Sequence, residues 1–480
     1  MNSFNKLKDV AETSVMLFLD AAALVAIFKF SVLLRVVALP ALYAGFPREM
    51  PHGDLGRAGW IFLIWIFFLY YEGLYTKTFS FWDEIKALCK VAFFSTVGVF
   101  TIVSVARMSA DISRTIVVLM GLSAVFLLPA ARIAVKKILR AMGLLNRRVL
   151  ILGAGDTGRL VAGALIREPN YGYRVVGFLD DDPAKAGERI NGVKVHGGVD
   201  RAEQYVKRCS ISDLFIAMPG AGRDRVQSLV NSLQHKVDRI LVVPDMGGIA
   251  VLGTGLRHFF HEEVLAFEIE NNLANPFNVA IKRLFDIVVS LLLLPFLAVP
   301  MAVIVILILI DSKGAAVFAQ ERVGRRGRSF KCLKFRTMYI DAEERLRGLL
   351  LADPRARSEW EQNWKLNVDP RVTAVGRFLR TTSLDELPQV FNVLKGDMSL
   401  VGPRPVTKEE IDRYYRDAAE LCFCVRPGIT GLWQVSGRSN TGYAYRIALD
   451  SWYVRNWNLW LDIVILMKTF RIVAEREGAY

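Results

Sequence analysis

The sequence predicts a membrane protein in three parts: a bundle of four transmembrane helices, a parallel α/β module, and an α+β domain anchored by a re-entrant membrane helix. Of the 480 residues 53% are hydrophobic, and the mean hydropathy of +0.31 is high for a soluble protein. Long apolar stretches lie on both sides of a region in which strand-like and helix-like segments alternate. We expect the three parts at 1–146, 147–265 and 280–480.

Four apolar stretches open the chain. Each approaches the roughly 20 residues that a helix needs to cross the hydrocarbon core of a membrane. Asp20 lies within the first stretch, so we expect that helix to pack against its neighbours. Four buried helices of a soluble protein are the alternative, which the long uncharged run after Gly59 disfavours. The stretches are Val15–Val37, Gly59–Tyr75, Ile85–Ala106 and Ile116–Val135.

Charge predicts the orientation of the chain. The net charge is +14, and six basic residues lie from Arg132 to Arg148 with no acidic residue among them. By the positive-inside rule this end faces the cytoplasm, and four spans then put the N-terminus there too. Because the basic clusters adjoin apolar segments, we expect anionic lipids or substrates as partners and no nucleic acid. The five scattered cysteines predict neither disulfides nor a zinc site.

The α/β module begins with a glycine motif. The apolar run Val149–Leu152 leads into Gly153, Gly155 and Gly158, which fit the spacing Gly-x-Gly-x-x-Gly, and a helical pattern follows. Such glycines tighten the turn and let backbone amides approach a pyrophosphate, so a Rossmann-like fold is expected and these glycines are candidate nucleotide contacts. A module used for assembly or regulation is the alternative. The module contains no Tyr-x-x-x-Lys, which disfavours sugar chemistry of the short-chain-dehydrogenase type.

A fifth apolar stretch, Ile287–Ile310, is long enough to span a membrane. Pro295 and Pro300 interrupt it, and each removes a backbone donor and favours a bend. A full span would also put the remaining chain outside the cell, away from soluble nucleotide-activated substrates. We therefore predict a re-entrant helix over about 282–311 that bends at Pro295 and returns to the cytoplasmic face.

A basic segment follows this helix. Seven basic residues and no acidic one lie from Arg322 to Arg336, and Gly324 and Gly327 predict a hairpin turn within the segment. A solvated loop would explain this pattern. Its position directly after a membrane helix favours contact with phosphate, either in lipid headgroups or in a lipid phosphate.

Asp385 and Glu386 are the candidate chemical groups. Ser383 and Glu386 match a capping box, although Pro388 suits a helix that starts nearer Asp385. Either start puts both carboxylates at a helix N-terminus, which favours their ionised forms. Adjacent helical residues point about 100° apart, so we expect one carboxylate to attack and the other to bind metal. Nearby arginines and Mg²⁺ would suit phosphoryl transfer.

Several motifs resemble those of bacterial polyprenyl-phosphate sugar-1-phosphate transferases, the large monotopic phosphoglycosyl transferases. They are KFRTM at 334–338, the run from Asp369 to Pro405, RPGITGLWQVSGR at 426–438 and DSWYVRNW at 450–457. Their order and spacing match over about 280–480, which the resemblance identifies as the phosphoglycosyl transferase domain. The chain is most similar to the undecaprenyl-phosphate galactose phosphotransferase group.

The resemblance implies a reaction. A UDP-sugar and undecaprenyl phosphate would give undecaprenyl-diphosphate-sugar and UMP, the first step of O-antigen or exopolysaccharide synthesis at the cytoplasmic face of the bacterial inner membrane. It implies that Asp385 is the nucleophile, that a phosphosugar–aspartyl intermediate forms, that Glu386 binds Mg²⁺, and that Pro295 marks the break in the membrane helix. Galactose is the expected sugar and glucose the alternative.

The remaining candidates are contacts to phosphate or to uridine diphosphate. Structural ion pairs are the alternative for the arginines, and a bracing role is the alternative for the two residues on the expected loop after residue 430. The candidates are Arg336, Arg377, Arg380, Arg404, Gln434 and Arg438. The tryptophans of the last segment, among them Trp457, suggest an interfacial helix.

Two other classes of function compete with this one. They are a nucleotide-sugar oxidoreductase or dehydratase built on the glycine-rich module, and a non-catalytic membrane scaffold for polysaccharide assembly. The module and the membrane helices are also compatible with a homodimer.

Overall fold

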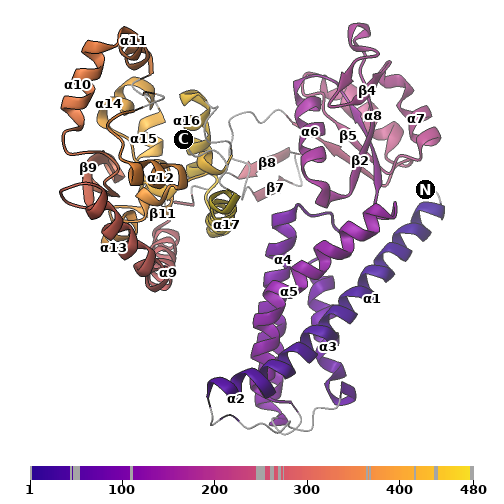
Figure 1. Ribbon diagram of the computed structural model, residues 1–480. Helices are drawn as coiled ribbons and strands as arrows, with labels where there is room; N and C mark the ends of the chain where they lie inside the picture. Colours follow the sequence, from indigo (N-terminus) through magenta and orange to yellow (C-terminus); the bar gives the residue numbers. More distant parts are fainter. Residues whose placement is uncertain are drawn as a thin grey trace. The chain divides into compact units, whose positions relative to one another are not determined.

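The computed structural model describes residues 3–43, 46, 55–108, 112–244, 255–259, 264–268, 272–273, 275–363, 366, 369–415, 418–436 and 442–475. These residues fall into two compact units, 1–245 and 246–480. The first unit contains a helical bundle and an α/β module, and the second contains one long apolar helix and an α+β domain (Figure 1).

The predicted apolar helices of the bundle are confirmed. The chain from 10 to 42, α4 and α5 are each long and apolar enough to cross a membrane, and α3 is a shorter apolar helix. Their facing sides bury large side chains such as Trp65, Leu88 and Met120. The helices are α1 (Ser3–Leu33), a π-helical turn (Leu34–Ala38), α2 (Leu39–Leu42), α3 (Leu55–Tyr71), α4 (Phe81–Val105) and α5 (Arg114–Ala141).

A buried ionic network joins three helices of the bundle. Arg132 of α5 is 2% exposed and donates to Asp20 of α1 at 2.8 Å and to Glu84 of α4 at 3.1 Å. Lys136, one turn further along α5, lies 2.6 Å from the other oxygen of Glu84. The prediction that Asp20 makes the first helix pack against its neighbours is therefore confirmed. Arg132 and Lys136, two of the six basic residues that predicted the orientation, belong to this network.

The predicted parallel α/β module is confirmed. Its sheet has the order β3-β4-β2-β1-β5-β6, with only β3 antiparallel to its neighbour. Alternate residues of β1 point to opposite faces: Leu150 packs with α7 and α8, and Ile151 packs with α6. The elements are β1 (Arg147–Leu152), α6 (Asp156–Arg167), β2 (Tyr173–Leu179), β3 (Arg189–Ile190), β4 (Val193–His196), α7 (Ala202–Cys209), β5 (Asp213–Ile216), α8 (Arg223–Leu233) and β6 (Arg239–Val242).

The second unit is assembled around short sheets. It contains the hairpin β7–β8, the hairpin β9–β10 with Gly327 in its turn at φ 73°, and the parallel pair β11–β12. The elements up to α12 are β7 (Gly255–Phe259), β8 (Val264–Glu268), α9 (Pro276–Asp311), β9 (Val317–Val323), β10 (Ser329–Phe335), α10 (Ala342–Ala352), α11 (Pro354–Asn363) and α12 (Ala374–Thr382). The later ones are α13 (Gln389–Lys395), β11 (Ser399–Val401), α14 (Lys408–Glu410), α15 (Ala418–Cys422), β12 (Gly428–Thr430), α16 (Tyr443–Arg455) and α17 (Leu459–Glu475).

Helix α9 contains both prolines of the fifth apolar stretch. The structure assigns one helix of 36 residues through Pro295 and Pro300, with no interruption of the helical assignment at either. The helix is long and apolar enough to span a membrane. The predicted bend and return at Pro295 stay a prediction.

The core of the second unit holds the start of α9. Lys282 donates to Asp462 of α17 at 2.6 Å and to the carbonyl of Val401 in β11 at 3.0 Å. Trp457 is 2% exposed and donates its indole N–H to the same Asp462 at 3.1 Å. The ring of Trp457 therefore packs inside the unit, and the interfacial helix suggested for the last segment stays a prediction.

Candidate active site

Two carboxylates lie in one short turn of the second unit. Asp385 and Glu386 belong to the 3-10 turn Leu384–Glu386 between α12 and α13. The capping box that Ser383 and Glu386 match in sequence does not form, since Ser383 has φ 55° and makes no side-chain cap hydrogen bond. Its left-handed backbone instead ends α12, and α13 begins only after Pro388. Both carboxylates therefore precede α13 and are not part of its first turn.

Lys334 of β10 approaches both carboxylates. Its Nζ lies 2.7 Å from Glu386 Oε1 and 3.8 Å from Asp385 Oδ2. Burial raises the pKa of the Asp385 carboxyl, Lys334 and Arg380 act to lower that pKa, and the charge of Glu386 acts to raise it. The two acids thus have different surroundings, because the ammonium group lies within hydrogen-bonding distance of Glu386 only.

A small pocket opens beside Glu386. Its cavity volume is about 10 Å³. Two residues predicted for phosphate contact, Arg404 and Gln434, line it together with Lys334 and Glu386. The other lining residues are Arg322, Cys332, Gln389, Pro405 and Ile429. The pocket therefore presents cations and amide groups opposite a carboxylate, which suits the stabilisation of a transferring phosphoryl group.

Packing fixes the turn that carries Arg404. The guanidinium carbon of Arg404 lies 5.5 Å from the centre of the Trp433 ring, and that of Arg446 lies 4.7 Å from the same ring. The backbone amide of Arg404 also stabilises the carboxylate of Asp450, which accepts from Tyr415 Oη at 3.2 Å. Asp450 is 1% exposed, and burial raises its pKa to about 7. The Arg404 turn is thus held by an aromatic ring and by a buried acid.

Gln434 has an unused acceptor. Its Nε2 donates to the carbonyl of Ile429 at 3.4 Å, and its Oε1 is buried without a hydrogen-bond partner among the described residues. A buried amide oxygen without a partner is costly, so a donor from a bound molecule or water would satisfy it. Substrate contact by Gln434 stays a prediction.

Arg380 lies next to the carboxylates from the side of α12. Its Nε donates to Thr337 Oγ1 at 3.0 Å, and its charge acts on Asp385. Arg336 is held elsewhere, since its guanidinium donates to the carbonyls of Ser312 and Lys313 just after α9.

The last two predicted arginines lie outside this cluster. Arg377 is exposed on α12, and Arg438 lies outside the described residues. Phosphate contact by Arg336, Arg377, Arg380 and Arg438 stays a prediction.

Lys334 and Gln389 line the pocket although the sequence assigned neither of them a role. Lys334 was included in the basic segment and in KFRTM, but only Arg336 of that motif was singled out. Strand alternation is the signal that identifies it, because Lys334 and the buried Cys332 are two residues apart on β10 and line the same pocket. Gln389 is the first residue of α13 and is 2% exposed, and no sequence signal distinguished it.

The donor set beside the turn fits Mg²⁺. This ion prefers oxygen ligands and usually takes one or two protein carboxylates together with substrate phosphates and waters. Asp385 and Glu386 offer carboxylate oxygens next to a pocket lined by cations. Among the described residues no group of three or more His, Cys, Asp or Glu side chains could hold a metal, so substrate oxygens would have to complete the shell.

The glycine motif has a packing explanation at two of its three positions. A Cβ on Gly153 would lie 2.5 Å from the carbonyl oxygen of Ala217, and one on Gly158 would lie 2.1 Å from that of Gly153. Gly155 precedes α6 and would meet nothing within 4 Å. The fold itself therefore requires two of these glycines, and nucleotide binding at Gly153, Gly155 and Gly158 stays a prediction.

Comparison with family models divides the chain in two. Residues 277–476 match the model described as bacterial sugar transferase, and residues 73–244 match the model described as CoA-binding domain. The first match covers the carboxylate turn and its pocket. The second covers α4 and α5 of the bundle and the α/β module.

Curated relatives match over most of the chain. A UDP-galactose-lipid carrier transferase of Erwinia amylovora is 40% identical over 85% of this chain and 84% of its own. An undecaprenyl-phosphate galactose phosphotransferase of Salmonella typhimurium is 39% identical over the same shares. A UDP-glucose:undecaprenyl-phosphate glucose-1-phosphate transferase of Escherichia coli is 32% identical over 69% of this chain and 68% of its own.

Proposed function

Because the chain belongs to the bacterial sugar transferase family, we propose that it transfers a hexose-1-phosphate from a UDP-sugar to undecaprenyl phosphate. UMP is the second product, and the lipid-linked sugar begins an O-antigen or exopolysaccharide chain. The observation that carries this proposal is the turn with Asp385 and Glu386, beside Lys334 and the pocket of Arg404 and Gln434.

Asp385 is the proposed nucleophile. A carboxylate oxygen forms a bond to the sugar-linked phosphorus, and the bond from that phosphorus to the bridging oxygen breaks, so that UMP leaves. A phosphate oxygen of the lipid then attacks the same phosphorus, and the carboxylate of Asp385 is released. Because the transfer takes place in two displacements, the UDP-sugar and the lipid phosphate need not occupy the site together.

The surroundings of the two acids support different roles. Asp385 is 15% exposed and lies 3.8 Å from Lys334 Nζ, which leaves one of its oxygens available for attack. Glu386 is paired at 2.7 Å with the same ammonium group. Glu386 and donor phosphate oxygens would hold Mg²⁺, which when bound neutralises charge on the phosphates. Arg404 and Lys334 would bind the phosphates and stabilise charge that develops during transfer.

The catalytic unit is proposed to stay on the cytoplasmic side of the inner membrane. Near the start of α9, Asp286 accepts from Ser399 Oγ at 3.1 Å, and near its end Ile308 packs against Leu379. One compact unit thus contacts both ends of the helix, whereas a hydrocarbon core of about 30 Å would separate the ends of a simple span. Between these ends Phe296 and Val299 are 79% and 71% exposed. A re-entrant helix whose apolar middle enters the membrane accounts for both observations.

Labelling tests this topology. A cysteine introduced at Lys313, an exposed residue just after α9, should react with an impermeant maleimide in permeabilised cells and not in intact cells. Reaction in intact cells above the background of the native cysteines would contradict the re-entrant helix.

The proposed sugar is galactose. The relatives named for galactose are 39–40% identical and cover more of this chain than the relative named for glucose, which is 32% identical. Comparing UMP release from UDP-galactose with that from UDP-glucose tests this choice directly. Faster turnover of UDP-glucose would show that glucose is the transferred sugar, and the proposed class of reaction would still hold.

Asp385→Asn tests the reaction itself. The substitution should abolish UMP release while the protein stays folded, and wild-type enzyme given UDP-sugar alone should show a phosphosugar adduct on the Asp385 peptide by mass spectrometry. Asp412→Asn, an exposed acid in the same unit, is the matched control and should keep wild-type turnover. Unchanged turnover of Asp385→Asn would falsify the nucleophile assignment. An oxidoreductase or a scaffold would release no UMP at all.

A further inference from the structure

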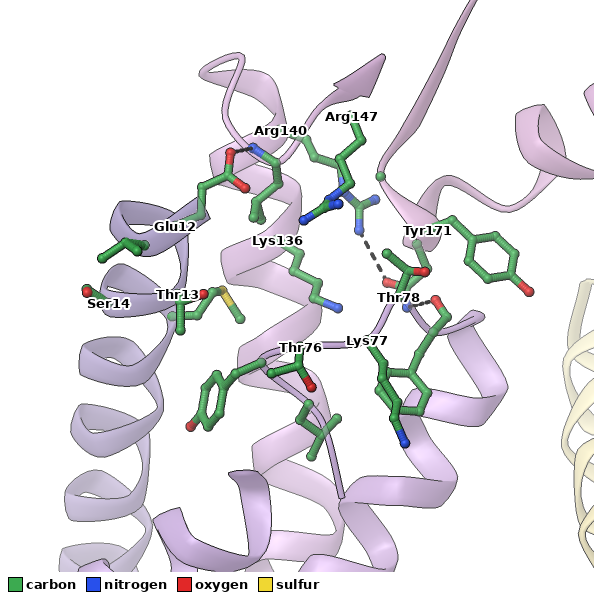
Figure 2. A pocket seen from close by; sticks show the side chains of 18 of the residues that line it. Glu12, Thr13, Ser14, Thr76, Lys77, Thr78, Lys136, Arg140, Arg147 and Tyr171 are labelled. Carbon is green, nitrogen blue, oxygen red and sulfur yellow. Dashed lines mark hydrogen bonds between the residues drawn. The ribbon is translucent and has the colours of Figure 1, made fainter. Parts of the chain in front are cut away.

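A second, larger pocket lies in the first unit, where the bundle meets the α/β module (Figure 2). Its volume of about 470 Å³ is in the range of small-molecule sites. Its walls come from the start of α1, the loop between α3 and α4, the end of α5, and the first turns of the module. The residues that carry the inference are Lys77, Lys136, Arg140, Arg147 and Arg239, with hydroxyl groups from Thr13, Ser14, Thr76 and Thr78.

The pocket is lined with positive charge. Five cations line it and Glu12 is the one acid among the described lining residues. Lys136 is paired with Glu84 at 2.6 Å, and Arg239 with Asp213 at 2.9 Å. Arg147 shares Asp213 at 3.7 Å. Counting Glu12 and both of these partners, five cations face three carboxylates, so positive charge remains in excess.

Arg140 accounts for much of this excess. Its Nη2 donates to the amide oxygen of Asn170 at 3.2 Å, and its Nε is buried without a hydrogen-bond partner. No carboxylate of the described residues lies within ion-pairing distance of its guanidinium. Figure 2 shows Lys136, Arg140 and Arg147 directed into the same open space. A partly buried guanidinium without an acid is costly, and an anion in that space would compensate it.

We propose that this pocket binds a phosphate-bearing anion. Guanidinium groups match the oxygens of a phosphate in pairs, and the hydroxyl groups of Thr13 and Thr76 can donate to further oxygens. The pocket also lies at the ends of α1 and α5, two helices able to span a membrane, where lipid headgroups gather. The phosphate therefore comes either from an anionic lipid or from a soluble nucleotide. This site is separate from the carboxylate turn and does not depend on the transfer reaction.

Binding to the full-length protein distinguishes the two sources. In nanodiscs of phosphatidylcholine, calorimetry with UDP, coenzyme A and inorganic phosphate tests the soluble source. In nanodiscs with and without phosphatidylglycerol, native mass spectrometry of retained lipid tests the lipid source. We expect one of these ligands to bind to wild-type protein, and Arg140→Gln to weaken that binding at least tenfold.

Two further variants keep the test decisive. Lys77 is exposed and has no ion pair among the described residues, so Lys77→Gln should fold normally and still weaken binding. Arg208→Gln removes an exposed cation of α7 away from the pocket and should bind as wild type does. If no soluble phosphate and no anionic lipid binds, or if all three variants bind equally, the inference is wrong.

Discussion

The ammonium group of Lys334 lies 2.7 Å from Glu386 and 3.8 Å from Asp385. One cation on β10 therefore lies near two adjacent acids of the neighbouring turn, and it is closer to Glu386 than to Asp385. It forms a direct ion pair with Glu386. For Asp385 it provides only part of the charge that opposes the effect of burial on the carboxyl pKa.

Lys334→Met should move the pH dependence of turnover. Burial already raises the pKa of Asp385, and removal of the cation should raise it further, because nothing on β10 would then favour the ionised carboxylate. The acid limb of the rate profile should therefore shift to higher pH, together with a loss of activity of about tenfold or more. Lys331→Met is the control, since this exposed residue is three positions away on β10 and faces the other side. An unshifted acid limb would show that Lys334 does not influence the pKa of Asp385.

Arg404→Gln should raise the KM for the UDP-sugar. The side chain lines the pocket and stacks on Trp433, so its removal eliminates a placed cation without opening the core. A charge-assisted contact to phosphate contributes roughly 1.5–3 kcal/mol, which corresponds to about a tenfold to hundredfold loss in kcat/KM. Arg413→Gln removes an arginine that lies on Tyr414, outside the pocket, and should have no such effect. Equal kinetics for the two variants would show that Arg404 does not bind the substrate.

Glu386→Gln should make the enzyme need more Mg²⁺. The amide keeps the size of the side chain but loses a charged oxygen ligand, so the Mg²⁺ concentration for half-maximal turnover should rise at least tenfold. Activity should recover in part at high Mg²⁺, which a purely structural defect would not allow. Glu344→Gln, on the exposed side of α10, should leave the Mg²⁺ titration unchanged.

Asp450→Asn should change how stability depends on pH. The folded-state pKa of about 7 is above the usual carboxyl value, so the folded protein holds a proton that the unfolded chain has lost. Wild-type stability should therefore fall as pH rises from about 4 to about 7. The amide cannot ionise, so at pH 8 the variant should melt several degrees higher than wild type. Thermal melts in detergent at pH 5 and pH 8 measure this difference, and parallel curves would contradict it.

Local patterns predicted the parts of the fold that depend on local chemistry. Apolar length predicted the helices of the bundle. The capping-box pattern was misleading because residues 383–386 fit either the first turn of a helix or, as observed, a 3-10 turn that follows the end of α12. In the structure Ser383 adopts a left-handed backbone that ends α12.

The sequence predicted which types of residue form the candidate site, but not which member of the basic run contacts the carboxylates. Asp385 and Glu386 stood out as adjacent acids among arginines, and Arg404 and Gln434 do line the pocket. Arg336 and Lys334 are two residues apart in one basic run, yet one reaches the end of α9 and the other reaches the acids. Their difference depends on tertiary neighbours, which composition and spacing do not encode.

The buried contact between Arg132 and Asp20 bears on how the protein is made. The two residues are 112 positions apart, so the ribosome completes α1 long before the guanidinium that neutralises its acid exists. On insertion scales an acid at the centre of a membrane helix costs roughly 2.5–3.5 kcal/mol, and Asp20 lies nearer one end of its helix. Until α5 is made, Asp20 can accept the hydrogen bond from Tyr75 at 2.9 Å but lacks its cation. The contact between Arg132 and Asp20 can therefore form only after α5, the last helix of the bundle, has been made. A chain that stops before residue 132 would therefore keep Asp20 without its guanidinium partner.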